Sequence, residues 1–165
     1  MRFVIGLIAI GLLAACGGGS NQNSAVVSQS PSSDQVTMRY LDLVRGFWSD
    51  YLDAENKGTE ASAPVACIQE VDMKVCADRV KEMIPVLQKF LTDLDSTPAP
   101  VKFATDDANF RHELPIAIAD LKLVLSAALA KDKATFSAKV DTYIRDMIPA
   151  VTGSLDDVDP TVTHN

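Results

Sequence analysis

The stretch "FRHELPIAIADLKLVLSAALAKDKATFSAKV", residues 110–140, decides the fold. Its apolar residues recur every three or four positions, which is the period of an α-helix that buries one face. The polar interruption "AKDK", residues 130–133, is so short that the helices on its two sides must pack antiparallel. Leu121 and Leu125 lie at the centre of the apolar face, and we expect both side chains to be fully buried.

The same period continues beyond position 34 and predicts an all-α domain. An up-down-up-down bundle is the simplest arrangement of four amphipathic helices joined by short and moderate connections. Asp132 is expected to cap the last helix, and Thr105 or Asp106 the one before it. The helices are expected at about 34–56, 72–95, 105–130 and 132–155, so that the domain spans 34–155 and leaves an acidic tail at 156–165.

Three of these helices carry an interior proline, Pro85, Pro115 or Pro149. Each proline removes a backbone hydrogen bond, so we expect kinked helices. The residues that we expect on the core faces include Tyr40, Val44, Phe47, Tyr51, Val80, Ile84, Leu87, Leu94, Phe110, Leu114, Leu121, Phe136, Val140, Ile144 and Met147, with Ile116, Ile118, Leu123 and Val124 widening the third face. The stretches "VKEMIPVLQKFLTDLD" (80–95) and "IRDMIPAVTGSLDDVD" (144–159) are similar, through duplication of a helical hairpin or by chance.

The N-terminus has the order of an export signal. A basic residue at position 2 precedes an apolar run at 3–13, which is too short for the roughly 20 residues of a membrane-spanning helix. The tetrapeptide Leu13-Ala14-Ala15-Cys16 that follows resembles the lipobox of bacterial lipoproteins. The resemblance implies that residues 1–15 are a signal peptide and that Cys16 becomes the lipidated N-terminus.

The resemblance also implies a place in the cell. Diacylglycerol and acyl chains on Cys16 would be the one covalent cofactor, and they would hold the protein to a membrane of the bacterial envelope. Gly17 occupies the position of an inner-membrane retention aspartate, which favours the outer membrane in a Gram-negative source; in a Gram-positive source the site is the outer face of the plasma membrane. Residues 16–33 have the Gly, Ser, Asn and Gln composition of a flexible linker, about 20–25 Å in reach.

The composition limits the classes of partner. The 165 residues carry 22 acidic and 15 basic side chains, a net charge of −7, with no cluster of Lys or Arg. Such a chain is a poor ligand for nucleic acid, and anionic lipid repels it. About 130 residues remain after the signal and the linker, which is enough for one domain with one core.

Cys67 and Cys76 form an even pair once Cys16 is lipidated. In an oxidising compartment a disulfide is the expected state of such a pair. Nine residues of continuous helix would separate them by about 13 Å, beyond the ~7 Å that a disulfide allows, so the segment between them must turn back. No His or further Cys lies near enough in sequence to suggest a metal site instead.

Few residues suggest a binding site. Trp48 lies at the edge of the aromatic stripe on the first helix and is the candidate for an exposed contact, while Phe47 and Tyr51 are expected in the core. His112 and Met38 could form an axial haem pair if the starts of the first and third helices meet, although a lone helical His is more often a surface residue. No C-x-x-C-H motif accompanies them.

Catalysis has no candidate residues, because the chain holds no phosphate-binding loop, no nucleophile elbow and no paired Glu-x-x-His motifs. The sequence therefore predicts a non-enzymatic envelope lipoprotein whose helical domain contacts another envelope protein or acts structurally. The alternative is a carrier that holds an apolar ligand or haem between its helices.

Overall fold

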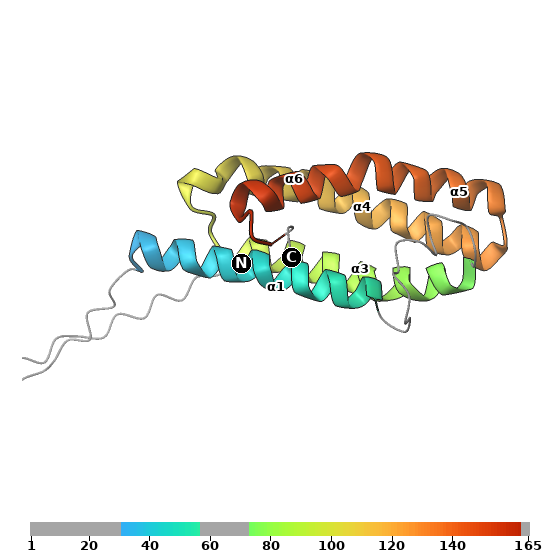
Figure 1. Ribbon diagram of the computed structural model, residues 1–165, viewed down its shortest axis with the longest axis horizontal. Helices are drawn as coiled ribbons and strands as arrows, with labels where there is room; N and C mark the ends of the chain where they lie inside the picture. The colour runs from blue at the N-terminus through green and yellow to red at the C-terminus, as the bar shows by residue number, and fades with distance from the viewer. Residues whose placement is uncertain (1–30, 57–72, 163–165) are drawn as a thin grey trace, which may run out of the picture. The chain divides into compact units, whose positions relative to one another are not determined.

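The computed structural model describes residues 31–56 and 73–162. Within these two ranges the regular structure is helical and contains no strand, which confirms the all-α prediction. The elements in chain order are α1 (Ser33–Asn56), α3 (Met73–Ser96), the 3-10 turn η1 (Val101–Phe103), α4 (Ala104–Ala130), α5 (Lys133–Thr142), the π-helical turn η2 (Tyr143–Met147) and α6 (Ile148–Val158) (Figure 1).

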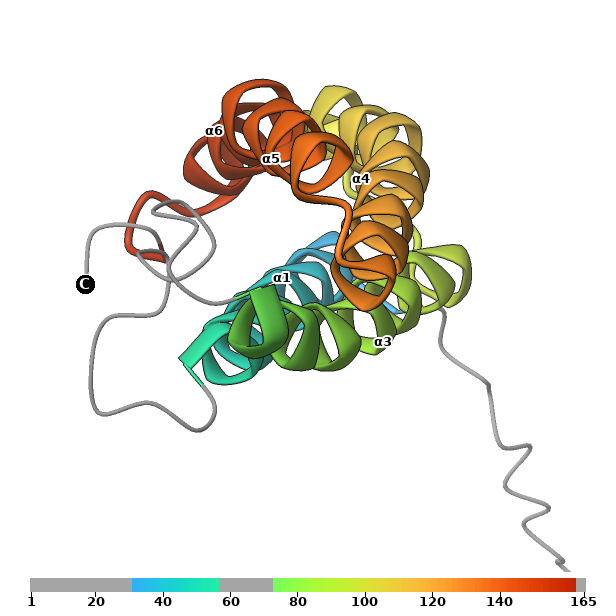
Figure 2. The same cartoon turned by 90° about the vertical axis from the view of Figure 1, so that its right-hand side faces the viewer.

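Four helical rods make up this part of the chain, because α5, η2 and α6 follow one another without a break. α3 packs against both α1 and α4, and α4 packs against α3 as well as against α5 and α6. α1 and α6 make few contacts, so among residues 31–56 and 73–162 the side between these two helices is the least closed. Figure 2, viewed along the rods, shows α4 between α3 and the α5–α6 rod.

Side chains and backbone geometry explain where the rods begin and end. Asp132 caps α5, as expected, by accepting a hydrogen bond from the Thr135 backbone N–H at 3.1 Å. α4 begins at Ala104, directly after η1, and its N-cap is Phe103, so the expected caps Thr105 and Asp106 lie inside the helix. The acidic residues of that first turn still interact favourably with the positive end of the helix dipole.

α4 ends in a left-handed residue. Lys131 has a φ of 57°, its N–H bonds the Ala128 carbonyl at 3.2 Å, and the Asp132 N–H bonds the Ala127 carbonyl at 2.9 Å. This pair of bonds is the Schellman motif, whose left-handed position usually holds glycine because a side chain there is strained. The motif reverses the chain within the "AKDK" connection and brings α5 back along α4.

Aromatic rings form the centre of the core. Phe47 of α1 stacks on Phe90 of α3 with 4.0 Å between ring centroids, and the edge of Phe90 meets Phe110 of α4 at 5.3 Å. Fully buried leucines from three of the rods belong to the same core cluster as these rings, at positions 87, 94, 114 and 155. Each such side chain contributes about 1.5–3 kcal/mol relative to an exposed position.

The predicted core face of α4 is partly wrong. Leu121, Ile118 and Val124 are buried as expected, with exposed fractions of 2, 7 and 1 %. Leu125 is only half-buried, and Ile116 and Leu123 are 42 and 46 % exposed. The neighbours of α4 lie on two of its sides, so its third side stays at the surface although the residues there are apolar.

The fourth rod changes its winding at η2. The N–H of Ile148 bonds the carbonyl of Tyr143, five residues back, and Pro149 follows directly. Pro149 has no N–H for the carbonyl four residues before it, and a wider π turn places the proline at the start of a new helical segment instead. At the start of this turn Tyr143 is buried and the expected core residue Ile144 is half-buried, whereas Met147 at its end is buried as expected.

The other two prolines lie in uninterrupted α-helix. α3 continues through Pro85 and α4 through Pro115. The similar stretches at 80–95 and 144–159 therefore differ in local structure, since one is α-helical throughout and the other includes η2.

The packed part of the chain continues further towards the C-terminus than the sequence suggested. α6 continues to Val158, and Asp159 is only 6 % exposed. The Arg45 Nε donates a hydrogen bond to the Asp159 carboxylate at 2.7 Å, and the Thr161 hydroxyl donates another at 2.7 Å. The prediction of a tail from residue 156 is therefore wrong for residues 156–161, because this acidic stretch packs against the domain and contacts α1.

Candidate functional site

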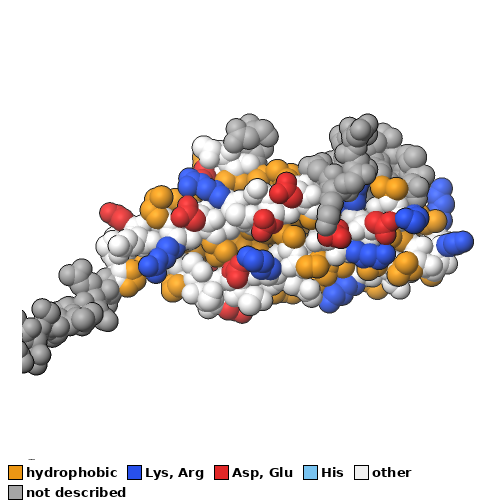
Figure 3. All heavy atoms as spheres, turned by 90° about the horizontal axis from the view of Figure 1, so that it is seen from below, with side chains coloured by type: hydrophobic (Ala, Val, Ile, Leu, Met, Phe, Trp, Pro, Cys, Tyr) orange, Lys and Arg blue, Asp and Glu red, His pale blue; other side chains and the backbone are white. Residues whose placement is uncertain are grey.

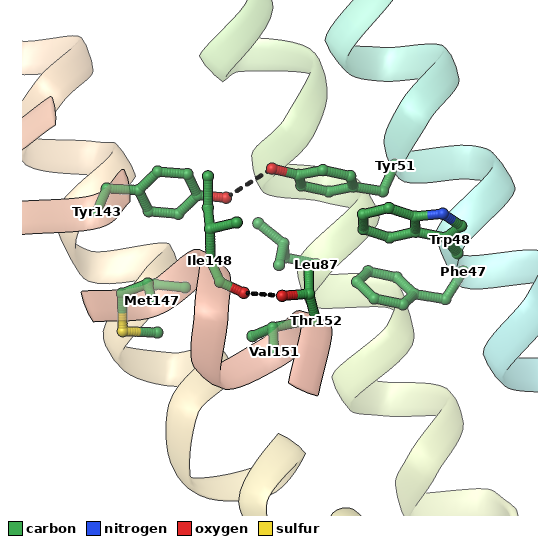
Figure 4. A pocket seen from close by; sticks show the side chains of 10 residues that line it. Phe47, Trp48, Tyr51, Leu87, Tyr143, Met147, Ile148, Val151 and Thr152 are labelled. Carbon is green, nitrogen blue, oxygen red and sulfur yellow. Dashed lines mark hydrogen bonds between the residues drawn. The ribbon is translucent and has the colours of Figure 1, made fainter. Parts of the chain in front are cut away.

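An apolar slot lies on the least closed side of the domain, between α1 and the η2–α6 segment (Figure 4). We call it the Trp48 slot. Its cavity volume is about 20 Å³, which is the room that a single water molecule needs. Ten uncharged residues line it: Phe47, Trp48, Tyr51, Leu87, Ala117, Tyr143, Met147, Ile148, Val151 and Thr152.

The helical period of α1 separates Trp48 from its aromatic neighbours. Phe47 and Tyr51 are four residues apart, lie on the same side of the helix and are 4 and 6 % exposed. Trp48 is one residue further round the helix and stays half-buried, with its ring stacked on Tyr51 at 5.4 Å between centroids. Among the residues that the structure describes, none accepts a hydrogen bond from the indole N–H. Trp48 thus offers an apolar face and a hydrogen-bond donor at the rim of the slot.

Two tyrosines tie α1 to the π turn at the inner end of the slot. The hydroxyl of Tyr51 lies 3.0 Å from the hydroxyl of Tyr143, and both side chains are buried (Figure 4). Burial raises the pKa of Tyr143 to about 12 and that of Tyr51 well above its ordinary value. Both phenols are therefore neutral at physiological pH and act as hydrogen-bonding groups, not as general bases.

A carboxylate and a guanidinium set the electrostatics near this pair. Burial raises the pKa of Glu55, and the positive charge of Arg79 opposes that shift. Arg79 is itself only 3 % exposed. The charge of Glu55 in turn contributes to the raised pKa of both tyrosines.

A second hollow lies on the outer side of the α1–α3 pair, around Gly46. Its volume is about 150 Å³, and its lining combines Phe47 and Phe90 with three aspartates and Lys89. Lys89 is paired with Asp93 at 2.6 Å. Figure 3 shows one face of the domain, on which acidic and basic side chains alternate between small apolar areas. This hollow has a mixed charge pattern, unlike the uncharged Trp48 slot.

The structure places the expected site residues at different depths. Trp48 is half-buried and lines the slot. Cys76 is fully buried in α3, while its expected partner Cys67 and the expected lipidation site Cys16 lie outside the described residues. The disulfide and the lipid on Cys16 therefore stay predictions.

The two weak haem candidates lie at the surface. The side chain of His112 is 72 % exposed and its Nδ1 is 2.9 Å from the Glu113 carboxylate. Met38 is 52 % exposed. The structure therefore brings neither side chain into an internal cavity where a haem could lie between them.

Residues 31–56 and 73–162 contain no group of three or more His, Cys, Asp or Glu placed to hold a metal ion. None of the helices in these ranges has the length and apolar character needed to cross a membrane.

Sequence reasoning missed most of the slot. Tyr143, Ile148 and Thr152 were not expected at a site, because the π turn that orients them leaves no periodic signal in the sequence. The single local hint is Pro149, which predicts an irregularity in the helix but not its kind.

The chain matches no family model, no curated protein and no solved structure.

Proposed function

We propose that this protein is a lipoprotein of the bacterial envelope whose non-enzymatic helical domain binds another envelope protein through α1 and the Trp48 slot. A half-buried tryptophan beside an uncharged slot carries the proposal. Tryptophan supplies more binding energy per residue than most side chains at protein interfaces, particularly where it fills or borders a pocket.

The anchor in this proposal is the lipid on Cys16. The residues between Cys16 and α1 would act as the linker and hold the domain close to the membrane surface. A domain held near its partners meets them at a high effective concentration, so a small contact surface is sufficient. Replacing Cys16→Ser should release the protein from the membrane fraction without unfolding the helices, and retention of that variant in the membrane would contradict the anchor.

The domain in this proposal is an up-down-up-down bundle with bends at its prolines. The Schellman motif at Lys131 and the packing of α4 against both α3 and the α5–α6 rod support this topology. The few contacts between α1 and α6 leave the slot accessible at its Trp48 rim, where a partner can reach it.

The size of the slot favours a protein partner over a stored ligand. A cavity of about 20 Å³ accepts a water molecule or part of one side chain, whereas an acyl chain or haem would require α1 and α6 to move apart. The uncharged lining and the π turn keep the carrier as the second candidate, since π turns occur frequently at functional sites.

The test is cross-linking in cells with a matched pair of variants. Trp48→Ala should weaken the capture of an envelope protein, while Leu41→Ala should leave it intact. Leu41 is a suitable control because it is also half-buried and lies seven residues earlier on nearly the same side of α1, outside the slot. Thermal unfolding of both variants should show that the domain remains folded.

Two outcomes would contradict the proposed partner. Equal loss of capture in Trp48→Ala and Leu41→Ala would show that the contact does not depend on the slot. Absence of any captured protein, together with lipid in native mass spectra or a haem absorption spectrum of the purified chain, would establish the carrier instead.

A further inference from the structure

α4 carries an exposed apolar face outside the Trp48 slot. The face consists of Ile116, Ala119, Leu123, Ser126 and Ala130, and we call it the α4 face. Its members follow one another at intervals of three and four residues, so they lie along one side of the helix. Between positions 116 and 130, all of which the structure describes, Lys122 is the one exposed charged residue.

Other solvent-facing helix surfaces of the domain are different. The exposed side of α3 carries ion pairs between residues three or four apart, such as Lys74 with Asp78 at 2.8 Å and Lys89 with Asp93 at 2.6 Å. Exposed charge is sparser along the α4 face: Ile116 and Leu123 are 42 and 46 % exposed, and the charged residues of α4 within one turn of them are Glu113, Lys122 and the buried Asp120. A contiguous apolar surface on a folded domain usually marks an interaction site.

The spacing of the α4 face is nearly the same in both directions. Counted from Leu123, its members lie seven and four residues before and three and seven residues after. An antiparallel copy of the helix therefore matches it, with Leu123 against its counterpart, Ile116 against Ala130 of the second copy, and Ala119 against Ser126 of the second copy. Ile116 thus meets a small side chain, the two small residues Ala119 and Ser126 allow close approach, and the two Leu123 side chains meet at the centre.

The charges at the two ends of α4 support the same orientation. Residues 104–113 hold three carboxylates and one guanidinium, whereas residues 131–133 hold two lysines and one carboxylate. With Leu123 opposite its counterpart, position 113 of one copy faces position 133 of the other, so an antiparallel pair brings Glu113 beside Lys133 and also opposes the helix dipoles, while a parallel pair would bring like charges together. Lys122 lies at the edge of the face, where its long side chain can extend into solvent.

We propose that the domain associates with a second copy of itself through the α4 face, antiparallel and with Leu123 on the two-fold axis. One helix face is smaller than the roughly 800 Å² per partner of a standard interface, so the pair is weak in dilute solution. Two copies confined to one membrane would associate far more readily. The pairing does not involve Trp48, so it can succeed or fail independently of the proposed partner site.

Cysteine cross-linking of the full chain in its own membrane tests the register. Leu123→Cys should form a disulfide-linked dimer under mild oxidation, because the two copies meet at this position. Ala119→Cys alone should not form this dimer. In the antiparallel pair the two copies of position 119 lie on opposite sides of Leu123, eight residues or about 12 Å apart along the helix axis. Co-expressed Ala119→Cys and Ser126→Cys chains should form the mixed dimer.

The control is Ala138→Cys, an exposed position on α5 away from the α4 face. We expect at least about tenfold more dimer for Leu123→Cys than for this control, since a disulfide forms only when the two Cα atoms approach within about 7 Å. In a parallel pair each position meets its own counterpart. Equal dimer yields for the single variants Ala119→Cys, Leu123→Cys and Ser126→Cys would therefore indicate a parallel pair and overturn the proposal. Dimer yields at control level for Leu123→Cys would overturn it as well.

A second measurement does not depend on introduced thiols. Leu123→Glu places a charge on the axis and should lower the dimer captured by an amine-reactive cross-linker about tenfold, while Trp48→Ala should leave it unchanged. Leu123 is partly exposed, so circular dichroism should show a folded variant. If Leu123→Glu instead abolishes capture of a different envelope protein and no dimer is found in the parent chain, the face binds that protein and not a second copy.

Discussion

The hydroxyl of Tyr51 lies 3.0 Å from the hydroxyl of Tyr143, and this bond joins residues 92 positions apart in the sequence. It connects α1 to the π turn across the least closed side of the domain, at the inner end of the Trp48 slot. Together with the ion pair between Arg45 and Asp159, this bond links the first rod to the last.

The tyrosine pair should show strong coupling in a double-mutant cycle. Tyr51→Phe or Tyr143→Phe alone leaves the other hydroxyl buried without its partner and should lower the free energy of unfolding by about 1–3 kcal/mol. The double variant removes both polar groups and should cost clearly less than the sum of the single variants. Urea denaturation of the four proteins measures the coupling, and simple additivity would show that the hydroxyls do not depend on each other.

Alkaline pH should unfold the domain through its tyrosines. Burial raises the pKa of Tyr40, Tyr51 and Tyr143, the three tyrosines of the chain, and that of Tyr143 from 10.0 to about 12. The unfolded chain then loses tyrosine protons at lower pH than the folded one. The contribution of the tyrosines to the free energy of unfolding should stay constant below about pH 10 and fall as pH rises from there towards 12, by up to about 1.4 kcal/mol per pH unit for each tyrosine.

The measurement is an ultraviolet absorbance titration, in which phenolate formation is followed together with helix content. Tyrosine ionisation should coincide with the loss of helical structure. Titration of a tyrosine at its ordinary pKa while the helices remain intact would contradict the buried positions of these side chains.

Leu121 and Leu123 form a matched pair on α4. Leu121 is 2 % exposed and Leu123 is 46 % exposed, although both are leucines on the same helix two residues apart. Leu121→Ala should cost about 2–5 kcal/mol through lost burial and the cavity it leaves. Leu123→Ala should cost under about 1 kcal/mol in the monomer. Chemical denaturation at low protein concentration compares the two, and similar costs would mean that the orientation of α4 is wrong.

Replacing Lys131 with glycine should stabilise the domain. Its φ of 57° is left-handed, which strains any residue that has a Cβ atom. Lys131→Gly should raise the free energy of unfolding by about 0.5–1 kcal/mol, because the Schellman motif remains and the strain is removed. Lys133→Gly, inside the first turn of α5, is the control and should destabilise the domain. A drop in thermal stability for Lys131→Gly would contradict the left-handed geometry.

The predicted pairing of Cys67 with Cys76 can be tested with the native chain. Both thiols should resist alkylation in protein isolated from the envelope and become reactive after reduction under denaturing conditions. Closing a loop of about ten residues should add some 2–3 kcal/mol to the free energy of unfolding in the chain-entropy estimate. Mass spectrometry that finds two alkylated cysteines without prior reduction would refute the pairing.

Much of the fold follows from local sequence. The 3.6-residue period identified four helical rods, the capping geometry of Asp132 was expected from its position before α5, and the edge position of Trp48 followed from its place on the helical wheel. These features depend on residues within one or two turns of each other, so the chain encodes them without reference to the rest of the domain.

The tertiary structure decided what local pattern could not. Leu123 and Leu125 are equally apolar, and only the positions of α3 and the α5–α6 rod determine that Leu123 lies at the surface and Leu125 is half-buried. The bond between Tyr51 and Tyr143 and the ion pair between Arg45 and Asp159 join residues 92 and 114 positions apart. Such contacts form only when the rods pack, because the gain from burial and pairing depends on which surfaces meet and not on the period within any one helix.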